Sequence, residues 1–156
     1  MPDNAPAPSP QTLFALTNSL QPVRRAWIQV ARVTVESMNL SVPVGTAVLM
    51  TYRYGPDITQ KDLAFAVGVN SGALVRTLDQ AENAQLLERA DSPTDRRSKI
   101  VNLLPEGRKV ALEIEKRLQA VRQDLFDGIP EEDIKVATRV LRALEERVVT
   151  RLGAQD

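Results

Sequence analysis

Apolar residues recur at helical spacing between residues 58 and 107, and they predict two short helices around a tight turn. The first helix covers Gln60–Val67, with Thr59 as its N-cap and Asp62 at the third position, close to a capping box. The turn follows at residues 68 to 71, where a glycine gives the backbone its freedom and Asn70 or Ser71 caps the next helix. That second helix covers Gly72–Asn83, and its expected buried residues are Leu74, Val75, Leu78 and Ala81.

The second helix presents a mostly polar face on its other side. The residues expected to face outward are Asn70, Ser71, Ala73, Arg76, Thr77 and Gln80. Two helices around a tight turn form a helix-turn-helix, which places its second helix in the DNA major groove. These six residues are therefore the candidates for contact with DNA, although Asn70 and Ser71 fit a capping role equally well.

Two short, partly apolar runs follow the second helix and predict a β-hairpin. They are Leu86–Ala90 and Ser98–Leu104, separated by a turn rich in Asp, Ser and Pro. Three cations, Arg96, Arg97 and Lys99, lie at or beside the tip of this hairpin. A hairpin behind a helix-turn-helix forms a winged helix, whose wing can place arginine in a narrow minor groove.

The flanking segments predict long helices on both sides of this lobe, so the fold class is mainly α with a small β-hairpin wing. Proline recurs in residues 1–10, which favours an extended, mobile arm. Residues 11–20 predict a short helix, and Pro22 fits the start of a second helix that ends near Met38. The apolar face expected for that second helix consists of Val23, Ala26, Trp27, Val30, Val33 and Thr34. Further helices are expected at residues 43–54, 106–126 and 131–152.

Apolar residues of the last predicted helix spread over more than one face, which a small domain cannot cover alone. We expect a homodimer in which residues 11–39 and 106–156 pair two copies around winged-helix lobes formed by residues 40–105. A two-fold dimer implies a pseudo-palindromic DNA site.

Composition excludes several kinds of chemistry. The chain has neither cysteine nor histidine, which removes disulfides, thiolate chemistry and the usual zinc ligand and general base. We expect no metal and no cofactor. No apolar run approaches the ~18 residues of a membrane span, and no signal-peptide pattern opens the sequence, so we expect a cytoplasmic protein with no membrane partner.

The formal net charge is zero, which on its own does not indicate nucleic-acid binding. We explain it as the average of a basic wing and acidic terminal helices. Asp79 and Glu82 offset Arg76 on the second helix, so we expect modest, salt-dependent DNA affinity.

Four stretches of the sequence resemble the MarR family of bacterial winged-helix regulators, most closely its SlyA branch. They are ITQKDLAFAVGV, LVRTLDQAE, DRRSKIVNL and PEGR. The resemblance implies that Arg76 lies at the DNA surface and that Asp95 and Arg97 form the wing signature, with the carboxylate orienting the guanidinium. Arg96 and Lys99 suit phosphate contacts. The resemblance also implies repression by default, with activation by displacement of other proteins as the alternative in the SlyA branch.

Three positions depart from the family pattern. Gln85 stands where the family has glycine, and a left-handed conformation there would cost on the order of 1 kcal/mol unless Asn83 takes that role. Leu104 replaces a capping threonine, which leaves the long helix to start at Pro105. Ala73 replaces a serine that is common in the SlyA branch, so one DNA contact is missing.

The resemblance further implies a small aromatic or phenolic anion bound between the dimer helices and the lobe. The candidate lining residues are Arg24, Trp27, Met50, Tyr52 and Arg53. A plain core role for Trp27 and Met50 is favoured over ligand binding, and the sequence does not identify the ligand.

Two readings from other classes remain open. One is a winged-helix protein-interaction module that has lost specific DNA binding. The other is an enzyme that uses carboxylates such as Asp91 and Asp95, which is disfavoured because an exposed turn offers no apolar pocket to raise a pKa. We therefore expect a ligand-responsive, sequence-specific DNA-binding regulator without enzymatic activity.

Overall fold

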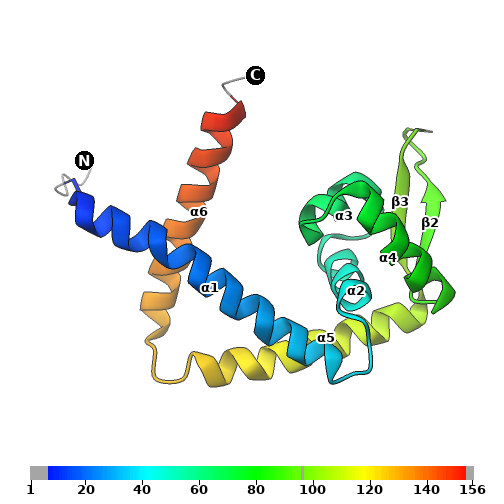
Figure 1. The fold of residues 1–156 in the computed structure, drawn as a ribbon, viewed down its shortest axis with the longest axis horizontal. Coiled ribbons are helices and arrows are strands. Elements are labelled where there is room, and N and C mark those ends of the chain that lie inside the picture. Colours follow the sequence, from blue (N-terminus) through cyan, green and yellow to red (C-terminus); the bar gives the residue numbers. More distant parts are fainter. Residues whose placement is uncertain (1–6, 96, 154–156) are drawn as a thin grey trace. The chain divides into compact units, whose positions relative to one another are not determined.

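The computed structural model describes residues 7–95 and 97–153, and these residues form a mainly helical fold with one small sheet (Figure 1). The chain divides into two compact units, Met1–Leu118 and Gln119–Asp156, which are described separately below. In chain order the elements are α1 (Pro10–Glu36), α2 (Val42–Tyr54), β1 (Ile58–Thr59), α3 (Gln60–Val67), α4 (Ser71–Asn83), β2 (Leu87–Asp91), β3 (Lys99–Leu103), α5 (Pro105–Leu125) and α6 (Glu131–Gly153). The expected fold class is confirmed.

The sheet has three antiparallel strands in the order β1-β3-β2. The predicted hairpin is present, with Leu87 opposite Leu103 and Asp91 opposite Lys99. The edge strand β1 was not predicted, because its two residues are too few to give an alternating pattern. In it, Ile58 pairs with Val101 and joins the start of the helix-turn-helix to the wing.

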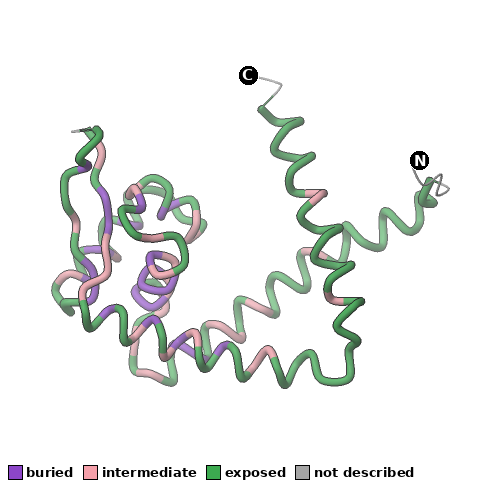
Figure 2. The backbone as a smooth tube through the Cα atoms, turned by 180° about the vertical axis from the view of Figure 1, so that it is seen from behind, coloured by how far each residue is buried: buried purple, intermediate pink, exposed green. Residues whose placement is uncertain are grey.

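The core of the winged-helix lobe gathers apolar residues from α2, α3, α4 and the sheet. Leu63, Leu74, Leu78 and Val101 are completely buried, and Leu87 is nearly so. Burial of each such side chain stabilises the fold by about 1.5–3 kcal/mol. Figure 2 shows buried residues on α2 and on the sheet, whereas the described residues of α6 are exposed or intermediate and none is buried. The helical spacing therefore identified most of this core correctly.

A second apolar cluster joins the C-terminal part of α1 to α2 and α5. Val35, Leu49, Ile114 and Leu118 are buried in it, with Trp27 and Met50 packed against them. The apolar pattern predicts that Val33, and not Val35, lies on the inner face of this helix. Val33 is 64% exposed and Val35 only 4%, so the inner face is turned relative to the prediction.

The predicted break at Pro22 is wrong, because α1 runs without interruption from Pro10 to Glu36. A proline inside a helix removes one backbone hydrogen bond. Here it lies in an exposed stretch, where water can bind the freed carbonyl group. Helix α1 also begins at Pro10, capped by Ser9, and thus takes in the last residue of the predicted arm. Most of that arm, residues 1–6, lies outside the described residues.

Helix α5 runs from Pro105 to Leu125, one residue earlier at each end than the predicted range 106–126, and its first turn packs tightly against Leu86, which follows α4. Leu104 donates its N–H to the Leu86 carbonyl oxygen at 3.0 Å. A Cβ atom on Gly107 would lie 1.9 Å from that same oxygen, so only glycine fits there. Of the large apolar residues of α5, Ile114 and Leu118 are buried, whereas Leu112 and Leu125 are about half exposed.

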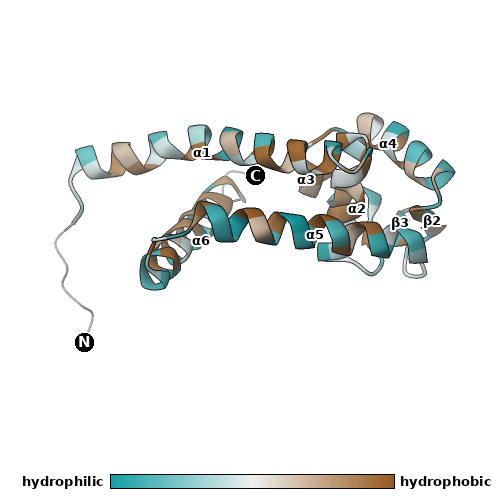
Figure 3. Ribbon diagram, turned by 90° about the horizontal axis from the view of Figure 1, so that it is seen from below, coloured by the Kyte–Doolittle hydropathy of each residue, from teal (hydrophilic) through white to brown (hydrophobic). Residues whose placement is uncertain are grey.

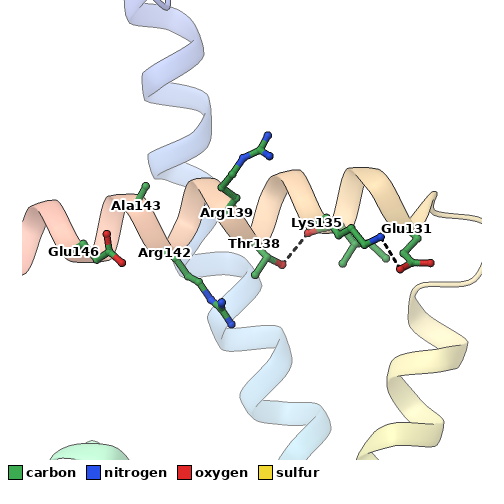
Figure 4. Close-up of a pocket in the computed structure, with 8 residues that line it drawn as sticks. Glu131, Lys135, Thr138, Arg139, Arg142, Ala143 and Glu146 are labelled. Atoms are coloured by element: carbon green, nitrogen blue, oxygen red, sulfur yellow. Dashed lines mark hydrogen bonds and ion pairs between the residues drawn. The ribbon is translucent and has the colours of Figure 1, made fainter. Parts of the chain in front are cut away.

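The second unit contains the end of α5, a turn with Gly128 at φ 76°, and α6. No described residue of α6 is buried, although Val140, Leu141, Val149 and Leu152 are large and apolar. Brown and teal residues alternate around this helix in Figure 3. One side carries a shallow groove where Lys135 pairs with Glu131 at 2.9 Å and the Thr138 hydroxyl donates to the Ile134 carbonyl (Figure 4). None of the described helices combines the length and apolar character needed to cross a membrane.

Candidate nucleic-acid interface

The helix-turn-helix has the caps and the turn that the sequence predicted. Thr59 accepts the Asp62 N–H at 3.1 Å and donates its hydroxyl to the Asp62 carboxylate at 2.6 Å, which begins α3. Gly68 ends that helix in the left-handed conformation at φ 79°. Asn70, and not Ser71, caps α4 by accepting the Ala73 N–H at 2.8 Å. These contacts fix the start of α4 relative to α3.

The outer face of α4 is the one predicted from the sequence. Leu74, Leu78 and Ala81 are completely buried and hold the helix against the core. Val75 was predicted to be buried, but it is 36% exposed because it lies about 100° around the helix from Leu74. The exposed residues at the start and along the outer face of α4 are Asn70, Ser71, Ala73, Arg76 and Gln80, and Thr77 is half-buried.

Arg76 is the principal cation of this face. Asp79 and Glu82 were expected to offset its charge, but both carboxylates instead bind Arg89 of β2. Within the described part of the chain, Arg76 has neither an ion pair nor a hydrogen bond from its side chain. Its guanidinium is therefore uncommitted and exposed to solvent.

The chain leaves α4 through a left-handed residue at Gln85, with φ 56°. The alternative that Asn83 takes this role is wrong, because Asn83 is the last residue of the helix. The Leu86 N–H donates to the Ala81 carbonyl oxygen at 2.9 Å, which stabilises the turn. A non-glycine residue in this conformation costs about 1–2 kcal/mol.

The wing tip is organised by its own hydrogen bonds. Ser92 is 7% exposed, and its hydroxyl accepts the backbone N–H groups of Thr94 and Asp95. Asp95 accepts the backbone N–H of Arg97 at 2.9 Å and the hydroxyl of Ser98 at 2.8 Å. These two hydrogen bonds, the backbone one first, hold the pKa of the Asp95 carboxyl below its usual range. The tip therefore keeps a defined shape at neutral pH.

The proposed role of Asp95 in orienting the Arg97 guanidinium needs correction. The carboxylate binds the backbone of Arg97, and it orients the side chain only through the turn. The Arg97 guanidinium is exposed and has no partner among the described residues. Lys99 forms an exposed ion pair with Asp91 across the hairpin at 2.7 Å. Arg96 lies outside the described residues.

An ion-pair cluster that the sequence analysis missed joins the wing to α4. Arg89 Nη2 binds Asp79 Oδ1 at 2.6 Å and also binds Glu82 Oε2, while the Arg89 backbone N–H donates to Glu82 Oε1 at 2.8 Å. The hydrogen bond from Arg89 lowers the pKa of Glu82, and the same contact raises the pKa of Arg89. Two acids three residues apart on a helix, followed by an arginine in the next strand, were the available signal.

The five residues proposed to bind a small ligand do not form one site. Trp27 and Met50 pack against the second core cluster, and Arg24 is exposed on α1. Tyr52 and Arg53 line an open cavity of about 540 Å³ between the end of α2, β3 and the start of α5. Arg53 is partly committed, since it binds Glu115 at 2.7 Å.

That cavity contains polar groups that the sequence analysis did not anticipate. The Arg108 guanidinium lies over the Tyr52 ring, 5.9 Å from its centre. Thr51 also lines the cavity, is 2% exposed, and has a hydroxyl with no hydrogen-bond partner in the described structure.

The sequence and the fold are similar to those of known proteins. Residues 44–99 match the model of the MarR family. The structure resembles that of the transcriptional regulator PA3341, with a TM-score of 0.79 and 28% identity over 86% of this chain and 98% of that one. It also resembles Streptococcus pneumoniae FabT, solved in complex with DNA, with a TM-score of 0.67 and 20% identity over 88% of this chain and 98% of that one. A third similar structure is CouR from Rhodococcus jostii RHA1, bound to p-coumaroyl-CoA, with a TM-score of 0.70 and 21% identity over 83% and 90%.

The fold is a winged helix with additional N- and C-terminal helices. Residues 44–99 therefore resemble MarR-family proteins, and the structure resembles that of a transcriptional regulator.

Proposed function

We propose that this protein is a ligand-responsive, sequence-specific DNA-binding regulator of the SlyA type. It acts as a homodimeric transcriptional repressor and is located in the cytoplasm. The observation that carries the proposal is the presence of two uncommitted arginines, Arg76 on the outer face of α4 and Arg97 at the wing tip. Helix α4 is packed against the core and the wing tip is held by its own hydrogen bonds, so the backbone position of each arginine is fixed. Arginine without an internal partner in such a position suits bidentate recognition of guanine or insertion into a narrow minor groove.

The two elements divide the work. On α4 the face formed by Asn70, Ser71, Ala73, Arg76, Thr77 and Gln80 enters the major groove, where Arg76 supplies the strongest base contact. At the wing, Arg97 enters the minor groove, while Arg96 and Lys99 bind phosphate and add affinity that depends on salt. Asp95 shapes the tip from which Arg97 projects.

Dimerisation involves the terminal segments, residues 11–39 and 106–156, around the lobe of residues 40–105. The exposed apolar residues of α1 support this, since Phe14 and Val23 are each about two-thirds exposed. On α6, Val149 and Leu152 are exposed to a similar degree. Covering a few such side chains contributes about 25 cal/mol for each Å² of apolar surface removed from water. A two-fold dimer then requires a pseudo-palindromic operator.

The ligand is a small aromatic or phenolic anion, which suits the cavity beneath Tyr52. Arg108 supplies a guanidinium that lacks an ion pair in the described structure, Thr51 supplies an unused hydroxyl, and Leu103 and Pro56 supply apolar walls. We expect Arg108→Ala to abolish the effect of salicylate on DNA release while leaving DNA affinity without salicylate unchanged. Salicylate sensitivity that persists in Arg108→Ala would place the ligand elsewhere.

Fluorescence anisotropy tests the function itself. The DNA is the segment immediately upstream of the coding region, compared with a scrambled duplex of equal length at two salt concentrations. We expect the native duplex to bind tightly, with one dimer for each site, and to weaken steeply as salt rises. Equally weak binding to both duplexes would favour a winged-helix interaction module without specific DNA binding, to be tested next by a search for a protein partner.

A further inference from the structure

The wing and α4 share an apolar core, and within the described residues the polar link between them is made by Arg89. In the described part of the chain, every hydrogen bond from the wing (β2, β3 and the turn between them) to a side chain of α4 comes from Arg89. Its guanidinium binds both Asp79 and Glu82, and its backbone N–H binds Glu82 as well. The Arg89 side chain is 24% exposed, so these contacts are partly shielded from water.

The place of Arg89 along the ribbon gives this contact its importance. Arg89 lies in the middle of β2, opposite Val101. The strand ends two residues further on, at Asp91, a distance of about 7 Å at the usual rise, and the turn with Arg97 follows. Among the described residues, the other ion pair of the wing is Lys99 with Asp91, which joins β3 to β2 and does not involve α4. Thus Arg89 is the polar anchor closest to the tip.

From this geometry we infer that Arg89 is a positioning residue that sets where Arg97 lies relative to the recognition helix. The inference rests on the proposed DNA-binding function. When Arg89 bridges α4 and β2, the helix proposed to bind the major groove and the wing that carries Arg97 are held as one rigid unit. Without the bridge, the hairpin keeps its strand pairing but its tip loses a fixed offset from α4.

A second consequence concerns charge. Asp79 and Glu82 lie on the helix that approaches DNA, where unpaired carboxylates would repel phosphate. Arg89 compensates one of these two charges and hydrogen-bonds both groups, and its contact holds the pKa of Glu82 down. Loss of Arg89 therefore weakens all DNA binding, and the positioning effect has to be separated from this general loss.

A double-mutant cycle makes that separation. Dissociation constants on the native duplex are measured for wild type, Arg97→Ala, Arg89→Ala and the double variant. A parallel cycle replaces Arg97→Ala with Ser71→Ala, because Ser71 is exposed at the start of α4, about two turns before Asp79, and does not depend on the bridge. Arg117→Ala serves as the matched control, since Arg117 is an exposed arginine that binds Glu113 and Ser37 far along the chain from the wing.

The expected result is selective coupling. In the Arg89→Ala background the penalty of Arg97→Ala should fall by about fivefold or more, the range in which contacting residues couple. The penalty of Ser71→Ala should stay the same, as should both penalties in the Arg117→Ala background. Arg89→Lys, which keeps the charge but loses the forked geometry, should restore the coupling only in part.

Two outcomes would overturn the inference in distinguishable ways. Unchanged penalties for Arg97→Ala with and without Arg89 would show that Arg89 only stabilises the fold. Failure of wild type and Arg97→Ala to differ at all would instead refute the proposed role of the wing tip, and with it the basis of this inference. Thermal unfolding of each variant confirms that all are folded at the assay temperature.

Discussion

Replacement of Gly107 by alanine should destabilise the winged-helix lobe through one backbone clash. Gly107 lies in the first turn of α5, where a Cβ atom would meet the Leu86 carbonyl oxygen at 1.9 Å and its carbon at 2.8 Å. Real Cβ atoms do not approach backbone this closely, and a carbonyl group cannot rotate away as a flexible side chain can. The start of α5 must therefore move away from the end of the α4 turn.

The magnitude follows from what that movement breaks. The Leu86 carbonyl accepts the Leu104 N–H, and losing this buried hydrogen bond costs about 1 kcal/mol. Forcing additional volume into the packed junction costs about 1–3 kcal/mol. Alanine recovers up to about 1 kcal/mol, because it is a better helix former than glycine. The net expected loss is about 2 kcal/mol, a large share of the stability of a domain this size.

Urea denaturation followed by far-UV circular dichroism measures this loss. All samples are held at one protein concentration, because the stability of a dimer depends on it. Gly153→Ala is the control, since nothing lies within 4 Å of the Cβ position at the end of α6. We expect its effect to stay within about 0.5 kcal/mol. Equal stability of Gly107→Ala and wild type would show that the junction can relax, and the close-approach argument would fail.

Three further changes test other parts of the structure. Gln85→Gly should raise the free energy of unfolding by about 0.5–1 kcal/mol, because relief of left-handed strain exceeds the added freedom of the unfolded chain; a loss of stability in chemical denaturation would contradict this. Asp95→Ala should weaken binding to the native duplex by roughly tenfold in anisotropy, because the Arg97 N–H and Ser98 hydroxyl lose their acceptor and the turn loosens. The lowered pKa of Asp95 means that its contacts are present above the usual aspartate range, so binding by wild type should not change between pH 5 and 8 on account of this group. Because the pKa of Glu82 is lower in the folded than in the unfolded protein, its carboxylate stabilises the fold above the unfolded pKa, and this stability is lost as pH falls through the folded pKa. Glu82→Gln should therefore lose less stability on acidification than wild type does. Identical acid-unfolding curves for the two proteins would argue against the Arg89 contact.

Periodicity and capping chemistry were enough to predict the helix-turn-helix, because those signals are local. Thr59 and Asn70 lie next to the helices they cap, and Leu74 and Leu78 are one turn apart on a short amphipathic helix. The candidate DNA face was then defined by what remains on the outside. The wing was predictable for the same reason, since its turn residues lie between two apolar runs.

The features that the sequence did not predict depend on how separate elements pack against one another. The pairing of Arg89 with Asp79 and Glu82 depends on how β2 returns along α4, which the sequence pattern does not show. Pro22 is not a helix boundary, because it lies in an exposed stretch of α1 where water can bind the carbonyl group that loses its partner. The ligand candidates lie on segments expected to line a pocket, but the sequence does not show how those segments pack, and the structure places Trp27 in a core cluster and Tyr52 at a cavity.

The central claim is that Arg97 reads DNA from a shaped wing tip while Arg76 reads it from α4. Its most direct test is the ratio of dissociation constants for the native and scrambled duplexes, measured by anisotropy for wild type, Arg76→Ala and Arg97→Ala at equal salt. We expect a high ratio for wild type and a fall of roughly tenfold or more for each variant, as loss of one specific contact costs about 1–3 kcal/mol. A ratio near one for wild type, or the same ratio in all three proteins, would contradict the account.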